Sequence, residues 1–185
     1  PMQLAEFAER YGFPGPAAHS WAFAYFKERQ IDRMAKRHDD AIFYTGVRSQ
    51  ESDRRMRNIK GKYQHHRGKM YVAPIHDFAD SEVSEYIKTH NLSVNPSYET
   101  IGRSGDCYCG AYAHRSTELG ELQEYYPDHY EFLKSIESAV EFDESIPEER
   151  KLWGFGGLSK TELRSAVASN DERQIILCSN CDVGL

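Results

Sequence analysis

Two short apolar runs, separated by a strongly basic stretch, limit the folds that this chain can adopt. Residues 41–47 are mostly apolar, β-branched or aromatic, and residues 70–75 form a second such run that Pro74 ends. We predict a buried strand at the first run and a second strand at the other, and Gly46 marks the point where the first strand opens into a loop. A helix is expected over 81–90, with Asp80 as its N-terminal cap. The order of strand, basic loop, strand and helix favours an α/β fold.

The charge of the chain is segregated along the sequence. The net charge is −6, but the segment from Arg48 to Lys69 has eight basic and two acidic residues and carries +6. The segment from Ser116 to Arg150 has eleven acidic and two basic residues and carries −9. Segregated charge of this kind indicates what a protein binds, and the basic segment favours an anionic partner. The sequence has no apolar stretch of membrane-spanning length and no secretory leader, so we expect a cytoplasmic protein without a membrane partner.

The remaining pattern is helical. Helices are expected over 1–12, ended by Gly12, and over 20–38, where residues 27–29 are exposed and the apolar residues are Trp21, Tyr25, Ile31 and Met34. A further acidic helical stretch over 116–142 is interrupted near Pro127, and a capping box at Ser159 opens a last helix. We therefore predict an α/β domain over 1–105 and a mostly helical appendage over 106–185.

The basic loop after the first strand is a candidate anion site, because open parallel sheets bind ligands beyond the carboxyl ends of their strands. Arginine offers a planar pair of donors to one phosphate or sulfate, and serine adds a hydroxyl donor. The alternative is a solvated turn in which the arginines pair with neighbouring carboxylates. His65 and His66, further along the loop, are expected to be simply exposed. The candidate binding residues are Arg48, Ser49, Arg54 and Arg55.

Residues 46–55 resemble the Gly-Leu/Val-Arg-x-x-Glu/Gln-Ser-x-x-Arg element of the sulfonucleotide (PAPS/APS) reductase family, which belongs to the PP-loop adenine-nucleotide α-hydrolase-like proteins. Residues 11–27, 71–87 and 95–98 resemble other stretches of that family in order and spacing, so the similarity covers about residues 1–110. The resemblance implies the C-terminal part of a doubly wound, PP-loop/HUP-like parallel sheet. It also implies an adenine nucleotide (PAPS, APS or ATP) as substrate, and adds Lys27 as a weaker contact to its phosphates.

The chain departs from the family pattern in three places. The glycine- and serine-rich PP-loop is not among these residues, so we expect it before Pro1 or on a partner chain. Ala22 and Phe23 stand where cluster-bearing reductases carry paired cysteines, and the reductase tail Glu-Cys-Gly-Leu/Ile-His does not occur. A reductase of this sequence would therefore depend on another thiol donor, such as thioredoxin, to attack the sulfur.

Four cysteines form one CxC and one CxxC pair. Two disulfides or a redox-active CxxC remain open, but tight pairs best fit a four-thiolate metal site in a reducing compartment. The resemblance favours a 4Fe-4S cluster over Zn²⁺, with three nearby groups (Arg103, His114, Arg115) able to raise its potential. The metal site would either fix the helical appendage to the α/β domain or face the bound nucleotide. The proposed ligands are Cys107, Cys109, Cys178 and Cys181.

Three functions fit these observations. The first, which the resemblance implies, is binding of an adenine (sulfo)nucleotide and reduction or transfer of its sulfur group. The second is a PP-loop ATP pyrophosphatase that adenylates nucleic acid for sulfur transfer. The third is a non-catalytic module, held together by zinc, that binds nucleic acid or protein. Nucleic-acid binding is less favoured because few aromatic residues lie beside the basic loop to stack on bases.

Overall fold

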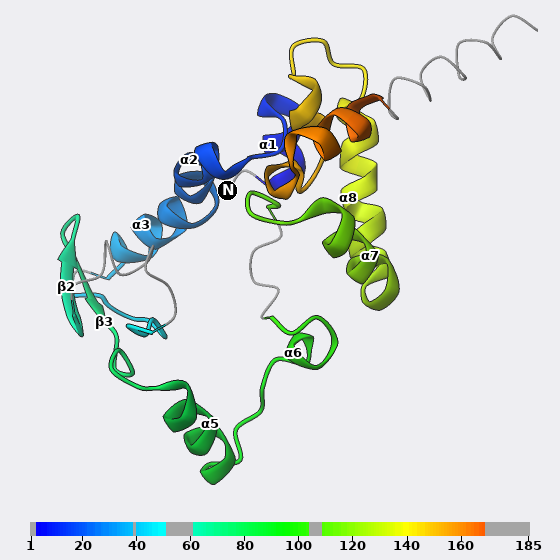
Figure 1. Cartoon of the computed structure of the whole chain (residues 1–185). Coiled ribbons are helices and arrows are strands. Elements are labelled where there is room, and N and C mark those ends of the chain that lie inside the picture. Colours follow the sequence, from blue (N-terminus) through cyan, green and yellow to red (C-terminus); the bar gives the residue numbers. More distant parts are fainter. Residues whose placement is uncertain (1–2, 39, 51–60, 104–108, 169–185) are drawn as a thin grey trace, which may run out of the picture. The chain divides into compact units, whose positions relative to one another are not determined.

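A computed structural model describes residues 3–38, 40–50, 61–103 and 109–168 (Figure 1). The chain divides into two compact units, one formed by Pro1–Arg29 with Glu99–Leu185 and the other by Gln30–Tyr98. The mixed α/β class is confirmed. The predicted boundary between residues 105 and 106 stays a prediction. No helix among the described residues reaches the length and apolarity that crossing a bilayer requires.

The first unit is helical. From its N-terminal stretch come α1 (Leu4–Tyr11), the short η1 (Pro16–Ala18), α2 (His19–Phe23) and the π-helical η2 (Ala24–Glu28). From its C-terminal stretch come α7 (Arg115–Tyr125), α8 (Pro127–Val140), η3 (Glu148–Lys151), η4 (Phe155–Gly157) and a last helix over 160–168. The predicted break at Pro127, the end of α1 at Gly12 and the Ser159 capping box are all confirmed.

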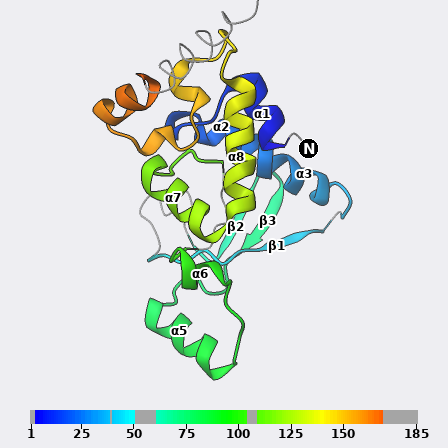
Figure 2. The same ribbon diagram turned by 90° about the vertical axis from the view of Figure 1, so that its right-hand side faces the viewer.

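The hydrophobic core of this unit joins stretches that are distant in sequence. Residues of α1 pack against α8, which Figure 2 shows alongside it. Each element contributes residues at helical spacing, so one apolar stripe meets another. Trp21 lies at the margin of this core and is 37% exposed. The buried cluster comprises Leu4, Ala8, Phe13, Ala113, Leu133, Ile136 and Trp153.

The second unit contains a three-stranded sheet in the order β1-β3-β2. Strands β1 (Ile42–Tyr44) and β3 (Lys69–Val72) are parallel, as the α/β prediction requires, and β2 (Tyr63–His66) pairs antiparallel with β3. Strand β2 was not predicted, and it returns into β3 through Arg67 and Gly68, both at positive φ. The prediction that the first strand is buried was wrong, because Ile42 is 52% and Tyr44 72% exposed.

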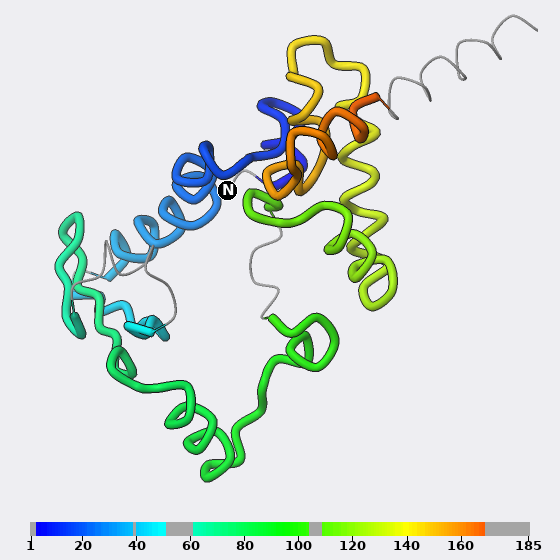
Figure 3. The backbone as a smooth tube through the Cα atoms, viewed as in Figure 1, coloured from blue at the N-terminus to red at the C-terminus, as the bar shows by residue number. Residues whose placement is uncertain are grey.

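Helices flank the strands along the chain. α3 (Arg29–Ala35) precedes β1, α5 (Asp80–Thr89) follows β3, and the short α6 (Ser97–Thr100) comes next (Figure 3). The helix predicted over 81–90 is present, but its N-cap is Ala79 rather than Asp80, and Glu82 accepts a hydrogen bond from the Ala79 N–H at 2.7 Å. Asp80 is the first helical residue, which leaves its carboxylate available for the loop after β1.

Candidate functional site

The loops that follow β1 and β3 lie side by side at the carboxyl ends of the two parallel strands. The Thr45 N–H donates to the Val72 carbonyl at 2.8 Å, and the Ser49 N–H donates to the His76 carbonyl at 2.7 Å. These two bonds extend the pairing of β1 and β3 past the end of the strands. They place the predicted anion loop at the edge of the sheet where ligands of open α/β sheets bind.

Arg48 is fixed within this edge. Its guanidinium Nη2 lies 2.7 Å from Asp80 Oδ1, and Nη1 donates to the Phe78 carbonyl at 3.4 Å. The side chain is only 14% exposed, whereas that of Asp80 is 82% exposed. Because α5 begins at Asp80, Arg48 connects the loop after β1 to the start of the next helix. The guanidinium is therefore held in a defined place at the predicted binding edge.

A second polar group at the same edge was missed by the sequence analysis. His76 Nδ1 lies 2.6 Å from Asp77 Oδ1, and Lys62 Nζ lies 3.0 Å from Asp77 Oδ2. The imidazole of His76, followed by the Lys62 ammonium, holds the pKa of the Asp77 carboxyl below its ordinary value. The adjacent His76-Asp77 pair directly after a predicted strand was the available signal for it.

The other predicted contacts are placed differently. Ser49 lies in the anion loop and takes part through its backbone N–H. Lys27 is exposed in η2, in the first unit. His65 and His66 are exposed, as expected, but they belong to β2 rather than to a loop. Arg54 and Arg55 lie outside the described residues.

Only one of the four cysteines falls within the described residues. Cys109 is half-buried and packs against the core cluster, next to Gly110 at φ +80°. Cys107, Cys178 and Cys181 lie outside the described residues, so the four-thiolate site stays a prediction. Across the described ranges, no three His, Cys, Asp or Glu side chains gather closely enough to hold a metal ion.

The basic neighbours of the first cysteine pair are engaged with carboxylates. Arg115 pairs with the buried Glu137, and Arg103 lies 2.5 Å from Glu121 and 3.1 Å from Glu118. These pairs offset the positive charge that was expected to act on a cluster at the cysteines.

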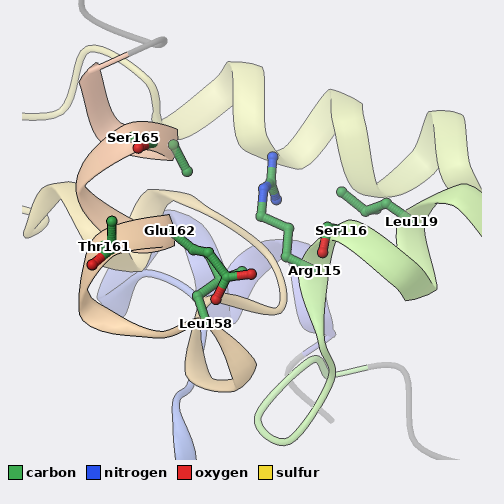
Figure 4. Close-up of a pocket in the computed structure, with 8 residues that line it drawn as sticks. Arg115, Ser116, Leu119, Leu158, Thr161, Glu162 and Ser165 are labelled. Carbon is green, nitrogen blue, oxygen red and sulfur yellow. The ribbon is translucent and has the colours of Figure 1, made fainter.

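A hollow of about 380 Å³ lies in the first unit between α7 and the last helix (Figure 4). Leu119 and Leu158 line it together with the Glu162 carboxylate and Arg115, whose guanidinium is already paired with Glu137. An apolar wall with a carboxylate does not suit a phosphate or sulfate. The sheet edge around Arg48 is therefore the better candidate for an anionic ligand.

The comparison with protein families identifies the family of the chain. Residues 4–111, more than half of the chain, match the model of the phosphoadenosine phosphosulfate reductase domain. The chain belongs to this family. No curated protein and no solved structure matches the sequence.

Membership of the phosphoadenosine phosphosulfate reductase domain family confirms the resemblance seen at residues 46–55. It implies the PP-loop fold, of which the parallel pair β1–β3 is described here, and it supports a function related to sulfonucleotides in general. The matched range ends at residue 111, so it includes the first cysteine pair and leaves out α7, α8 and the second cysteine pair.

Proposed function

We propose that the protein binds an adenine sulfonucleotide at the carboxyl ends of β1 and β3 and takes part in reducing or transferring its sulfur group. The observation that carries this proposal is the position of Arg48. It lies in the family element, at the ligand-binding edge of a parallel pair, with its guanidinium oriented by Asp80 and the Phe78 carbonyl. A guanidinium held in this way matches the two oxygens of a phosphate or sulfonate without further loss of side-chain freedom.

The residues around Arg48 would tune this binding. Asp80 competes with an incoming anion for the guanidinium, so nucleotide binding should separate the pair or share the donors of Arg48. Lys62 adds a second cation beside Asp77, and the loop bond from Ser49 to His76 keeps both loops together. Arg54 and Arg55 complete the family element and are proposed as further phosphate contacts.

We also propose that Cys107, Cys109, Cys178 and Cys181 hold a 4Fe-4S cluster, with structural Zn²⁺ as the other candidate. Four thiolates suit either group, and bound metal would contribute folding free energy to the region around Cys109. If all four thiols are metal ligands, the thiol that attacks the sulfur comes from another molecule. Iron, sulfide and zinc contents of the purified protein decide between the two groups.

The test of nucleotide binding is calorimetric titration of the full chain with PAPS, APS and ATP. Arg48→Ala should weaken binding by about tenfold or more, since a charge-assisted hydrogen bond contributes roughly 1.5–3 kcal/mol. Arg37→Ala removes an exposed arginine outside the site and should leave affinity unchanged. Equal affinity of the Arg48→Ala variant and the unchanged chain would reject the site.

The two chemistries differ in their products. Sulfite released from PAPS in the presence of a dithiol such as reduced thioredoxin indicates the reductase. Pyrophosphate released from ATP only when tRNA or DNA is present indicates the adenylating alternative. If either product forms only after a polypeptide with a PP-loop is added, a partner chain supplies the PP-loop.

A further inference from the structure

The central strand of the sheet, β3, ends between two segments that each carry a cation. The strand order is β1-β3-β2. On the β1 side, the Thr45 N–H donates to the Val72 carbonyl at 2.8 Å, three residues before Arg48. On the β2 side, the Ala73 N–H donates to the Lys62 carbonyl at 2.8 Å. The segments that flank the carboxyl end of β3 therefore supply one cation each.

The loop that follows β3 provides a carboxylate for each of these cations. Asp80 Oδ1 lies 2.7 Å from Arg48 Nη2, and Asp77 Oδ2 lies 3.0 Å from Lys62 Nζ. The Asp80 side chain is 82% exposed against 14% for Arg48, and that of Asp77 is 63% exposed against 46% for Lys62. In both pairs the carboxylate is the more exposed partner. Because exposed side chains change rotamer within nanoseconds, the carboxylate is the partner that can leave.

Arg48 is also held by contacts that do not involve Asp80. Its Nη1 donates to the Phe78 carbonyl at 3.4 Å, and the neighbouring Ser49 N–H donates to the His76 carbonyl at 2.7 Å. Both bonds join the loop after β1 to the loop after β3. The guanidinium can therefore stay at the binding edge when the Asp80 carboxylate moves away, and a ligand oxygen can take the place of the carboxylate.

The paired carboxylates set a threshold that an incoming anion must exceed. A competitor within the site lowers the apparent affinity of every ligand in proportion to the fraction of molecules in which the cation is unoccupied. Weakly bound anions of charge −1 then leave the site empty, whereas a phosphate monoester, with a charge of about −1.5 to −2 and three acceptor oxygens, still binds. Asp77 remains a competitor at low pH, because the His76 imidazole and the Lys62 ammonium hold its pKa below the ordinary value.

We propose that Asp77 and Asp80 act as built-in competitors, which hold the cations of the binding edge in the free protein and yield them to the anionic groups of the nucleotide. The inference rests on the proposed sulfonucleotide site at Arg48, and it makes Lys62 a second cation that contacts the same ligand. The ligand class favoured is a nucleotide with more than one anionic group, since each group displaces one aspartate. Small carboxylates are kept out, because they bind either cation no better than the aspartate already there.

The test is calorimetric titration of the full chain with PAPS at constant ionic strength. Asp80→Asn keeps an oxygen that can accept the Arg48 hydrogen bond and removes only the charge. Affinity for PAPS should therefore rise roughly two- to fivefold, the range expected for one exposed ion pair. Asp77→Asn should act in the same direction, and the double variant should combine the two gains. Asp40→Asn removes an exposed carboxylate before the start of β1 and should leave the affinity unchanged.

Replacement of chloride by acetate provides a second measurement. Acetate should weaken PAPS binding more in Asp80→Asn than in the unchanged chain, because the guanidinium released by the aspartate accepts a carboxylate from solution. Lower PAPS affinity of Asp80→Asn would overturn the proposal, since Asp80 would then orient Arg48 rather than compete for it. Unchanged affinity of both aspartate variants, or an equal effect of acetate on the two proteins, would overturn it as well.

Failure of this inference is distinguishable from failure of the proposed site. If Arg48→Ala loses PAPS affinity while neither aspartate variant gains it, the site stands and the competition is rejected. If Arg48→Ala binds PAPS as tightly as the unchanged chain does, the site itself is rejected, and the competition with it.

Discussion

Glu137 is a buried carboxylate with three different hydrogen-bond donors. Its carboxylate accepts hydrogen bonds from Arg115, from Lys134 Nζ at 2.6 Å and from the Trp153 N–H at 2.8 Å. Burial by itself raises the pKa of Glu137, but the hydrogen bond and charge of Arg115, with those of Lys134, outweigh it and hold the pKa below its ordinary value. One side chain therefore connects α7, α8 and the glycine-rich segment after Leu152.

Glu137→Gln should lower the free energy of unfolding by about 3–5 kcal/mol, because it leaves the Arg115 guanidinium buried without its counter-charge. Urea denaturation at neutral pH followed by circular dichroism measures the change. Glu131→Gln, at an exposed position of the same helix, should change the stability by less than about 0.5 kcal/mol. A similar effect of the two variants would show that the ion pair is not important for stability.

The contribution of Glu137 should also depend on pH. Its folded pKa is lowered, so the stabilisation is complete above the unfolded value of 4.5 and is lost as the pH falls from there through the folded pKa. The stability difference between the unchanged chain and Glu137→Gln should therefore shrink below pH 4.5. Urea midpoints of both proteins across this range provide the measurement, and a difference that stays constant would contradict the assignment.

At the scale of elements, the segment 153–157 owes its form to close backbone contacts. Gly110, at φ +80°, is one of the glycines that allow this, since a Cβ there would lie 2.7 Å from Trp153 Nε1 and 2.9 Å from the Gly154 N. Gly154 is itself left-handed, at φ +71°, against the Arg115 backbone. The buried Trp153 is thus positioned by glycines on two segments.

Gly110→Ala should destabilise the first unit by about 1–3 kcal/mol, because the added methyl group is both strained at positive φ and in contact with Trp153. The matched control is Gly120→Ala within α7, where a Cβ meets nothing within 4 Å and should stabilise the helix by roughly 0.5–1 kcal/mol. Thermal melts of both variants, monitored by the fluorescence of the tryptophans, test the opposite signs.

Elements with local signals could be predicted from the sequence, whereas burial could not. Pro127 separates α7 from α8 and Ser159 caps the last helix, since both depend on neighbouring residues alone. Strand β2 is polar, and it exists because Arg67 and Gly68 turn it back onto β3. The apolar β1 was predicted to be buried because its composition suits a covered strand, yet one face of its sheet has no cover among the described residues.

The same distinction applies to the candidate site. The position of Arg48 shortly after a strand could be predicted from the sequence, and the structure places it after β1. Its partners Phe78 and Asp80 lie about thirty residues away, so only the parallel pairing of β1 with β3 brings them together. His76 and Asp77 were missed although they stand next to each other directly after a predicted strand, because their partner Lys62 is brought to them only by the fold. The cysteine site could be predicted from spacing alone, and it stays a prediction.

At the scale of the whole molecule, the two units differ in how much core they contain. The buried cluster belongs to the first unit, whereas α5 in the second unit has no buried residue. Local opening is easiest where few apolar side chains are buried. Unequal stability of the two units follows from this distribution.

Hydrogen exchange should reveal this inequality directly. Backbone amides of α8 around Leu133 and Ile136 should exchange more slowly than those of α5 by at least about tenfold, since 1.4 kcal/mol of extra opening energy is sufficient. Mass spectrometry of peptides from both helices measures the rates. Phe13→Ala, which creates a cavity in the core, should accelerate exchange in α8 and leave α5 unchanged. Equal protection of the two helices would contradict it.

The packing of α1 against α8 also has a consequence for synthesis on the ribosome. More than 110 residues separate the end of α1 at Tyr11 from the start of α8 at Pro127. At about 5–20 residues per second, translation leaves the apolar stripe of α1 without its partner for roughly 6–23 seconds. Leu4 and Ala8, which belong to the core shared with α8, stay exposed during that interval, so we expect a chaperone to bind the first helix early in synthesis.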